Sequence, residues 1–526
     1  MRKAGILFFA ILMAYMVEAK DVTKVVTRPN IVLILVDDLG YSDLGCFGSE
    51  IKTPNIDKLA SDGIKFTQFT NCAKCETSRR TLMSGRYHTE VNIDKAGITI
   101  PENLALGGYQ NFMVGKWHHP DTPIKRGFDR FFGFLVGAVN HFNGVSSGGK
   151  YALRIDEEPY EIEDDFYSTD KFTDYALKYI NERDKAKPFF MYVAYNAPHY
   201  PLQAPKEEVM KYRGKYKDGW AVLRQKRYEY MQELGIISEE MSLSKPESET
   251  RKWESLSDEY RDNMDLRMAT YSAMIDRIDQ QVGRIISKLK QDKVFDNTLI
   301  IFLSDNGACP FDRTKKPTMD NNYMPWDERS YYCYPPEWAN ACNTPWRMYK
   351  QDQNEGGIST PLIAHWPKGI TVPGSFNRQR GHLVDLHATF RELAGADYPA
   401  EFKGRRIGPA RGISLVPAFT GKHRAEHEYF YQNYADHKIA LVMGKWKIVN
   451  NQYLYNIQKD RIESHDLSKS NPEKFQYMLK EFARRDRELN GGRIAKRGAG
   501  KRNRSSRKNM ENTKILTTKN TKSTKE

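Results

Sequence analysis

Acidic side chains follow two short apolar runs of the chain. Residues 31–36 (IVLILV) lead into two aspartates, and residues 299–303 (LIIFL) lead into Ser-Asp-Asn-Gly. Short continuous runs of aliphatic residues are typical of buried parallel strands, and ligands collect at the carboxyl ends of such strands. Three carboxylates and an amide placed there form an all-oxygen site for a hard divalent cation. The predicted metal ligands are Asp37, Asp38, Asp305 and Asn306.

Four further motifs carry polar side chains at fixed spacings. The first, residues 75–86 (CETSRRTLMSGR), has an arginine four residues after its cysteine. The others are residues 115–118 (GKWH), residues 197–199 (APH), and Lys350 with EGG five residues later. A Lys-x-His or a Pro-His pair alone is more often surface decoration than a site. Their order along one chain favours a functional role over chance occurrence. The candidate functional side chains are Cys75, Arg79, Lys116, His118, His199 and Lys350.

Together these motifs resemble those of the type I sulfatases, an arylsulfatase-containing family of the alkaline phosphatase superfamily. The resemblance extends over about residues 28–488. It implies that a maturation enzyme oxidises Cys75 to Cα-formylglycine, whose hydrate is the nucleophile and a further metal ligand. It implies Ca²⁺ as the metal, with Mg²⁺ as the alternative. The family usually has Pro or Ala where this chain has Thr77, so the maturation step needs a direct test.

The resemblance also implies a role for each remaining motif. Lys116 and Lys350 bind the sulfuryl oxygens, where their charge gains strength as the transition state forms. Arg79 holds the hydrate and the neighbouring acids. His199 or Lys350 assists the leaving group, and His118 removes the proton from the second hydroxyl of the hydrate, which re-forms the aldehyde and expels sulfate.

The predicted function is therefore a secreted sulfuric ester hydrolase that acts on an aryl or carbohydrate sulfate. Two alternatives stay open. One is a phosphonate or phosphate ester hydrolase of the same superfamily. The other is a non-catalytic binder of sulfated polysaccharide that uses the same pocket. The sequence does not identify the natural substrate or the position of its sulfate.

The formal net charge of +14 is concentrated at one end of the chain. Residues 491–526 hold twelve Lys or Arg and two Glu among Gly, Ser, Thr and Asn, which predicts a disordered basic tail. We expect an inert extension or a tether to anionic surfaces, and no nucleic-acid partner. At the other end, Arg2 and Lys3 precede the apolar run 4–17, a signal-peptide pattern over residues 1–19. This pattern predicts a secreted or periplasmic, extracytoplasmic protein.

Periodicity predicts the elements that position the site. Apolar residues repeat at alternating steps of four and three over residues 264–289, which indicates a long helix that packs on a sheet. Weaker helical patterns cover residues 54–63 and 167–183, and residues 189–195 form another buried strand. Alternating helices and strands predict an α/β fold, a doubly wound, mostly parallel sheet. By resemblance this is the alkaline-phosphatase-like architecture.

A small antiparallel subdomain is predicted near the C-terminus. Residues 439–442, 446–449 and 453–456 are short strands, and residues 472–485 form a helix. The predicted organisation is a signal peptide (1–19), a catalytic α/β domain (28–425), a C-terminal α+β subdomain (426–490) and the basic tail (491–526).

Three further features give weaker expectations. Five cysteines remain beside Cys75, an odd number that excludes a fully paired framework and leaves Cys333 and Cys342 as a possible pair. Residues 206–256 form a charged helical insertion. The aromatic residues of 309–345 overhang the active site and stack on substrate, or else pack on one another. His141 is a candidate substrate contact.

Overall fold

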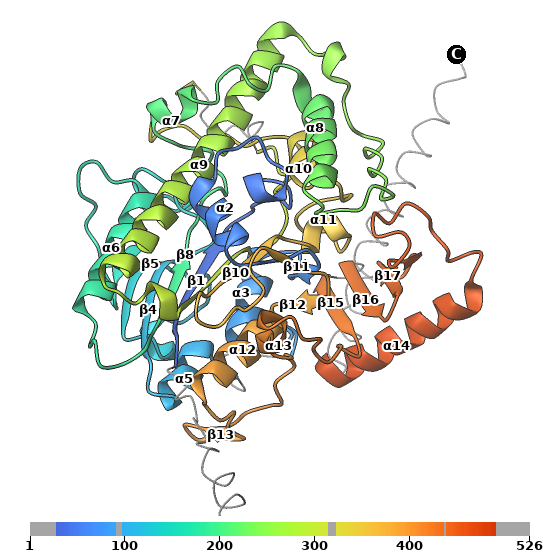
Figure 1. Ribbon diagram of the computed structural model, residues 1–526. Coiled ribbons are helices and arrows are strands. Elements are labelled where there is room, and N and C mark those ends of the chain that lie inside the picture. Colours follow the sequence, from blue (N-terminus) through green and yellow to red (C-terminus); the bar gives the residue numbers. More distant parts are fainter. Residues whose placement is uncertain (1–27, 91–96, 314–321, 436–437, 491–526) are drawn as a thin grey trace, which may run out of the picture.

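A ten-stranded mixed sheet forms the centre of the computed structural model, which describes residues 28–90, 97–313, 322–435 and 438–490 (Figure 1). The strand order is β11-β2-β10-β9-β1-β8-β4-β5-β6-β7, and β9, β1, β8, β4 and β5 run parallel. Antiparallel pairing is confined to β10, β6 and β7. The strands are β1 (Asn30–Val36), β2 (Ile64–Phe66), β4 (Gln110–Lys116), β5 (Arg130–Phe134), β6 (Leu153–Ile155), β7 (Glu158–Pro159), β8 (Phe189–Ala194), β9 (Thr298–Ser304), β10 (Leu362–His365) and β11 (Ser375–Asn377).

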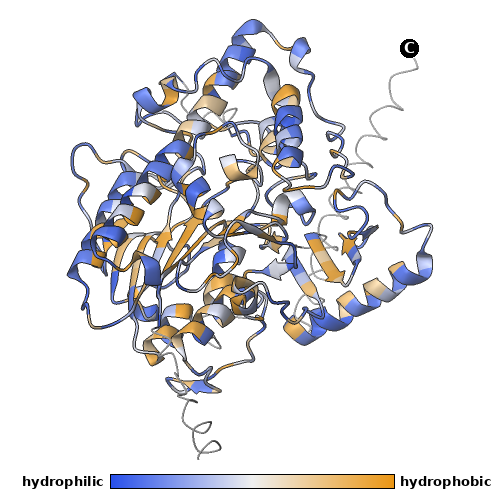
Figure 2. Cartoon of the chain, viewed as in Figure 1, coloured by the Kyte–Doolittle hydropathy of each residue, from blue (hydrophilic) through white to orange (hydrophobic). Residues whose placement is uncertain are grey.

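Helices cover both faces of this sheet, as the doubly wound prediction requires. Successive side chains of a strand point to opposite faces. In β1, Val32 and Ile34 therefore enter one core, and Ile31 and Leu33 enter the other. The strands are predominantly hydrophobic, whereas the helices turn hydrophilic residues outward (Figure 2). The first core holds α2 (Pro54–Ser61), α6 (Ser168–Glu182) and α9 (Asp258–Gln291); the second holds α3 (Cys75–Ser84), α5 (Ile100–Leu106) and α12 (Val384–Ala394).

The predicted long helix is α9, which runs for 34 residues. Ser257 caps its N-terminus by accepting a hydrogen bond from the Tyr260 amide, and Lys288 and Lys290 lie in its last turn, where cations favour the helix dipole. Its apolar stripe belongs to the same core as the even-numbered residues of β1. The helix therefore packs on the sheet, and β9 follows directly after it.

A separate four-stranded antiparallel sheet lies near the C-terminus. Its strands are β15 (Phe430–Ala435), β16 (Lys438–Met443), β17 (Trp446–Val449) and β18 (Tyr453–Asn456). The helix α14 (Pro472–Asn490) packs on one face through Met478 and Phe482. The predicted subdomain is confirmed, with β15 as an additional strand; the domain boundaries drawn from sequence stay predictions.

Other parts of the chain settle the weaker expectations. The insertion holds α7 (Lys206–Met210) and α8 (Gly219–Glu233), so it is helical as predicted. All six cysteines are free, so the possible pair of Cys333 and Cys342 does not form. Among the described residues, no helix has the length and hydropathy that a membrane span needs. The predicted signal peptide and basic tail lie outside the described residues.

Candidate active site

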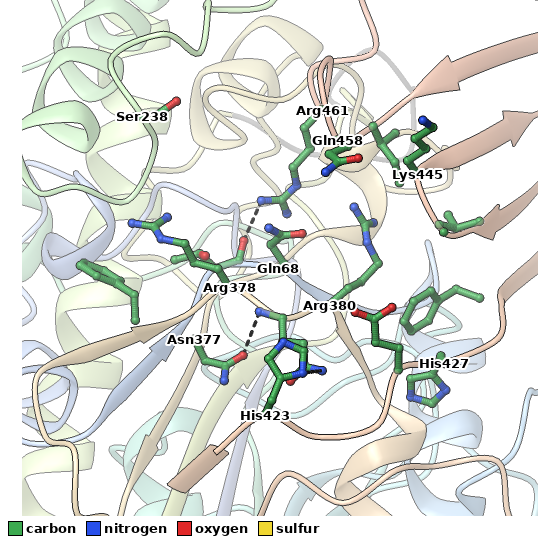
Figure 3. Close-up of a pocket in the computed structure, with 18 of the residues that line it drawn as sticks. Gln68, Ser238, Asn377, Arg378, Arg380, His423, His427, Lys445, Gln458 and Arg461 are labelled. Atoms are coloured by element: carbon green, nitrogen blue, oxygen red, sulfur yellow. Dashed lines mark hydrogen bonds between the residues drawn. The ribbon is translucent and has the colours of Figure 1, made fainter. Parts of the chain in front are cut away.

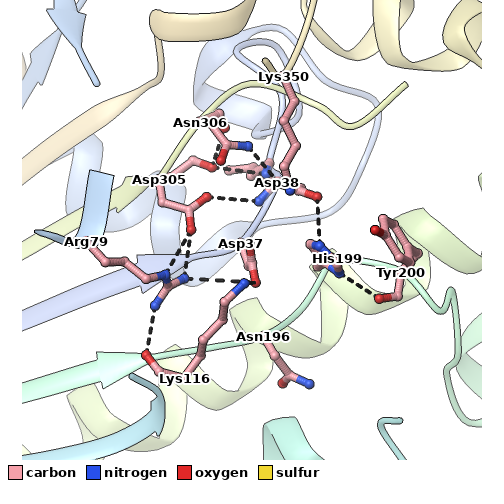
Figure 4. Close-up of polar contacts among 12 residues, drawn as sticks. Asp37, Asp38, Arg79, Lys116, Asn196, His199, Tyr200, Asp305, Asn306 and Lys350 are labelled. Atoms are coloured by element: carbon pink, nitrogen blue, oxygen red, sulfur yellow. Dashed lines mark hydrogen bonds and ion pairs between the residues drawn. The ribbon is translucent and has the colours of Figure 1, made fainter. Parts of the chain in front are cut away.

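Four parallel strands side by side, β9, β1, β8 and β4, bring the predicted site residues to one edge of the sheet. The register pairs Val36 with Ser304, so the acidic residues that follow β1 and β9 begin at the same level. Lys116 is the last residue of β4, and His199 lies in the loop after β8. Figure 4 shows these side chains converging with Arg79 and Lys350. The juxtaposition predicted from strand-end acids is therefore present.

Three buried oxygens at this edge accept no hydrogen bond from the described residues: Asp37 Oδ1, Asp38 Oδ2 and Asn306 Oδ1. Asn306 Nδ2 donates to Asp38 Oδ1 at 2.7 Å, so the amide oxygen of Asn306 is not used in that contact. Unpaired buried carboxylate oxygens are costly unless a cation is present. The donor set is all oxygen, as Ca²⁺ and Mg²⁺ prefer, so these residues fit a hard divalent cation.

Cys75 occupies the first turn of α3, at its N-terminal end, and is 4% exposed. Its Sγ lies with carboxylate oxygens of Asp37 and Asp305 in a group whose atoms are all within 4.8 Å of one another. Burial raises the pKa of the Cys75 thiol, although Lys116 and Lys350 act in the opposite direction. A buried thiol of raised pKa is a poor nucleophile in its unmodified form.

Three buried cations face the three carboxylates. Arg79 Nη2 donates to Asp305 Oδ2 at 2.8 Å, and Lys350 Nζ donates to Asp38 Oδ1 at 2.6 Å. Lys116 Nζ donates to Asp37 Oδ2. The two lysines predicted to bind sulfate are thus paired with the first two acids of the site.

The neighbouring charges give the buried acids different pKa values. Burial alone would raise the pKa of Asp37, but Lys116, His199 and Arg79 hold it well below its ordinary value. Burial and the neighbouring charge of Asp37 raise the pKa of Asp305. The site therefore holds one strongly ionised acid beside one that takes a proton more readily.

The two predicted histidines differ in their contacts. His199 Nε2 is 3.5 Å from Asp38 Oδ2, and its Nδ1 contacts the carbonyl oxygen of Tyr200 at 2.6 Å. His118, two residues beyond β4, adopts a φ of 59° and its Nδ1 has no hydrogen-bond partner. Burial lowers the pKa of His199 to about 4 and also lowers that of His118. Both rings are therefore neutral at pH 7.

Both ring nitrogens of His141 have polar contacts, and its role as a substrate contact stays a prediction. Its Nδ1 contacts Ser168 Oγ and its Nε2 contacts the carbonyl oxygen of His199, both at 3.1 Å. The ring is 1% exposed. With both nitrogens engaged, His141 holds the backbone of His199 in place.

Two tyrosines support the site although the sequence did not single them out. Each lies in an otherwise apolar pattern, and its hydroxyl is the only polar feature there. Tyr192, on β8, accepts a hydrogen bond from Arg79 Nη1 at 3.4 Å. Tyr271, on the apolar stripe of α9, donates to Asp43 Oδ2 at 2.7 Å and contacts the Asp38 carbonyl oxygen at 3.2 Å. Each lies where the pattern predicted only core.

The aromatic loop packs mainly on the first core. Trp338 and Trp346 are fully buried, and Tyr332 is 3% exposed. Tyr334 lines a small pocket together with Asp38, and the ring of Tyr331 lies 6.2 Å from that of Tyr200, the neighbour of His199. Residues 314–321 lie outside the described residues. Trp338 and Trp346 therefore pack in the first core, where their rings contact Trp220 and Tyr41.

Known proteins are similar to this chain in sequence and architecture. The family model described as Sulfatase matches residues 29–396. An arylsulfatase of Klebsiella aerogenes is 32% identical over 436 residues, 76% of this chain and 93% of the relative. The human N-acetylgalactosamine-6-sulfatase is 26% identical and aligns with 80% of this chain and 71% of its own. The crystal structure of Ps i-CgsB in complex with k-i-k-neocarrahexaose is 28% identical, with a TM-score of 0.63, over 87% of this chain and 92% of that chain.

Proposed function

This chain belongs to the sulfatase family and is a sulfatase, and we propose that it acts outside the cytoplasm on a sulfated carbohydrate, with a nucleophile made from Cys75 and a bound divalent cation. The observation that carries the proposal is the convergence of Cys75 with Asp37 and Asp305 beside buried oxygens that have no hydrogen-bond donor. The raised pKa of the buried thiol supports a modified nucleophile rather than a thiolate.

The modification and the metal each supply one kind of chemistry. A formylglycine hydrate at position 75 would offer two hydroxyls on one carbon, one to attack sulfur and one to release sulfate. A cation held by Asp37, Asp38, Asp305 and Asn306, with Ca²⁺ favoured and Mg²⁺ possible, would neutralise sulfuryl oxygens and acidify a coordinated hydroxyl.

The residues of the chain do the remaining work. Lys116 and Lys350 hold the sulfuryl oxygens through their ammonium groups, and their existing contacts to Asp37 and Asp38 keep both side chains in the site. His199 lies beside Asp38 and assists departure of the alcohol. His118, neutral and with a free Nδ1, accepts the proton that must leave before sulfate is released.

Relatives support a carbohydrate substrate. One is named for N-acetylgalactosamine 6-sulfate, and a solved structure was obtained with k-i-k-neocarrahexaose. The arylsulfatase of Klebsiella aerogenes supports action on small aryl sulfates as well. The signal-peptide pattern of residues 1–19 supports export.

Activity on paired small substrates tests the proposal. We expect matured protein to hydrolyse 4-nitrophenyl sulfate faster than 4-nitrophenyl phenylphosphonate, and Cys75→Ala to lose both activities. Faster turnover of the phosphonate would favour the phosphonate hydrolase alternative. Unchanged turnover in Cys75→Ala would overturn the assigned nucleophile. A panel of defined sulfated saccharides then identifies the sugar and the sulfate position.

A further inference from the structure

A basic cavity of about 770 Å³ lies between the catalytic unit and the C-terminal sheet (Figure 3). Its walls come from the segment after β11, the loop at 421–427, the turn between β16 and β17, and residues 236–241 of the helical insertion. None of the residues placed above in the active site lines it. The cavity is therefore a second candidate site, assembled from segments far apart in the sequence.

Positive charge dominates the lining. Among the described residues, no carboxylate lies within ion-pair distance of Arg378, Lys422 or Lys445. Lys422 and Lys445 are exposed at the mouth, on loops of the two different units. Glu426 is the one carboxylate among the described residues that line the cavity. The five cationic side chains that line the cavity are Arg378, Arg380, Lys422, Lys445 and Arg461.

The buried charge network that Arg380 and Arg461 join holds more positive than negative charge. Glu355 contacts Lys447 at 2.9 Å, Arg461 at 3.1 Å and Arg380 at 3.7 Å. Glu463 is a second partner of Lys447, at 2.7 Å. Two carboxylates thus serve three cations, and Arg380 has the longest contact. Burial and the nearby charge of Arg461 lower the pKa of Arg380, although Glu355 acts in the opposite direction. A buried cation in excess is stabilised by an anion supplied from outside.

The apolar part of the lining favours a saccharide over a nucleic acid. Ile236, Met241 and Ile457 add apolar groups to the lining, and ligand pockets combine such apolar groups with a few polar ones. The ring of Phe376 already carries Lys65 Nζ at 4.7 Å and the Arg378 guanidinium at 5.1 Å, so it is not a free platform for a base. The volume suits a short oligosaccharide segment rather than a duplex.

We propose that this cavity binds a sulfated saccharide segment at a place separate from the active site. The proposal rests on the proposed function for the class of ligand, because an enzyme that acts on sulfated carbohydrate meets further sulfates on the same chain. Arg380 and Arg461 bind sulfate inside the cavity, and Lys422 and Lys445 bind it at the mouth.

Lysine footprinting tests the proposal without any need for turnover. Cys75→Ala protein is acetylated briefly in the presence of sucrose octasulfate, a sulfated disaccharide, and each lysine is quantified by mass spectrometry. We expect acetylation of Lys422 and Lys445 to fall at least about threefold, because bound anions screen and cover them. Lys185 and Lys368, which are exposed elsewhere, serve as internal controls and should not change.

Four outcomes would overturn the proposal. The first is protection confined to the lysines of residues 491–526. The second and third are equal protection by unsulfated sucrose and equal protection by inorganic sulfate. The fourth is stronger protection by a DNA duplex, which would assign the cavity to nucleic acid.

Calorimetry with sucrose octasulfate gives an independent measurement. Lys422→Gln/Lys445→Gln should weaken binding about tenfold, and the matched pair Lys185→Gln/Lys368→Gln less than about twofold.

The footprint and the proposed function fail separately. Protection at Lys422 and Lys445 in a protein that never hydrolyses a sulfate ester would support the cavity as a binding site and contradict the proposed enzymatic function. Sulfatase activity without such protection would support the enzymatic function and contradict the binding site in the cavity.

Discussion

Arg79 donates two hydrogen bonds to a single oxygen of Asp305, from Nη2 at 2.8 Å and from Nε at 3.1 Å. Arg79 lies one helical turn beyond Cys75 on α3, and Asp305 follows β9. Nη1 of the same guanidinium donates to the carbonyl oxygen of Lys116 at 2.9 Å, at the end of β4. One side chain thus fixes the nucleophile helix against two strand ends.

Arg79→Lys should damage this arrangement although it keeps the charge. Lysine cannot reproduce the planar fork. We expect turnover of 4-nitrophenyl sulfate to fall about 100-fold, as for the loss of a preorganised charged donor, and stability to fall by about 1–3 kcal/mol, as for a lost charged hydrogen bond. Arg80→Lys is the matched control, since Arg80 pairs with the partly exposed Glu76 on the same helix. Equal losses in both variants would contradict the role given to Arg79.

Asp38→Asn should remove the response of the protein to metal. A cation that binds only the folded state raises stability by about 2.7 kcal/mol at a hundred times its dissociation constant. We expect the wild-type melting temperature to rise with Ca²⁺ and fall with chelator, and that of Asp38→Asn to respond to neither. Asp62→Asn, a change at a half-exposed acid, should behave like the wild type. A full calcium response in Asp38→Asn would exclude Asp38 as a ligand.

His118→Ala should separate the two halves of the reaction. His118 has a free Nδ1 and a lowered pKa, so it is placed to accept a proton rather than to bind the substrate. Stopped-flow measurement should show that the first release of 4-nitrophenolate is largely retained while later turnovers slow. His465→Ala, at an exposed histidine, should match the wild type in both phases. If the first release slowed as much as the later turnovers, the role of His118 would be wrong.

Buried His387 should make the protein sensitive to acid. It lies on α12 against Gly85, the C-cap of α3, and is buried. Burial lowers its pKa from 6.5 to about 3. The unfolded chain therefore binds more protons between these values, so stability is lost as the pH falls below 6.5. At pH 5 the loss is about 2 kcal/mol.

His387→Leu should abolish that part of the acid response. Chemical unfolding at pH 7 and pH 5 measures it, and the difference between the two pH values should shrink by about 2 kcal/mol relative to the wild type. His465→Leu should leave the difference unchanged. An unaltered difference in His387→Leu would show that this ring is not the sensor.

Sequence patterns predicted the elements whose signals are local. The apolar runs before Asp37 and Asp305 mark buried strands, and their acids meet because parallel strands end at one edge. The stripe of α9 is equally visible because it repeats over many turns. The motif residues, taken from family resemblance, converge on the same edge.

Features made by distant segments escaped prediction. Strand β15 carries Gln432 and Asn433 in an otherwise aromatic run, so its pattern does not indicate a strand. Tyr192 and Tyr271 look like core residues until the fold turns their hydroxyls toward Arg79 and Asp38. The basic cavity was equally invisible, because Arg380 and Lys445 belong to different units of the fold. Each depends on tertiary placement rather than on local spacing.

The mass of residue 75 tests the central claim most directly. Trypsin cleaves after Lys74 and Arg79, which isolates the peptide Cys75–Arg79. We predict that protein produced with a maturation enzyme yields this peptide about 18 Da lighter than its thiol form, as conversion of the thiol to an aldehyde requires, and that turnover scales with the converted fraction. Full sulfatase activity in protein whose residue 75 remains entirely a thiol would contradict the account.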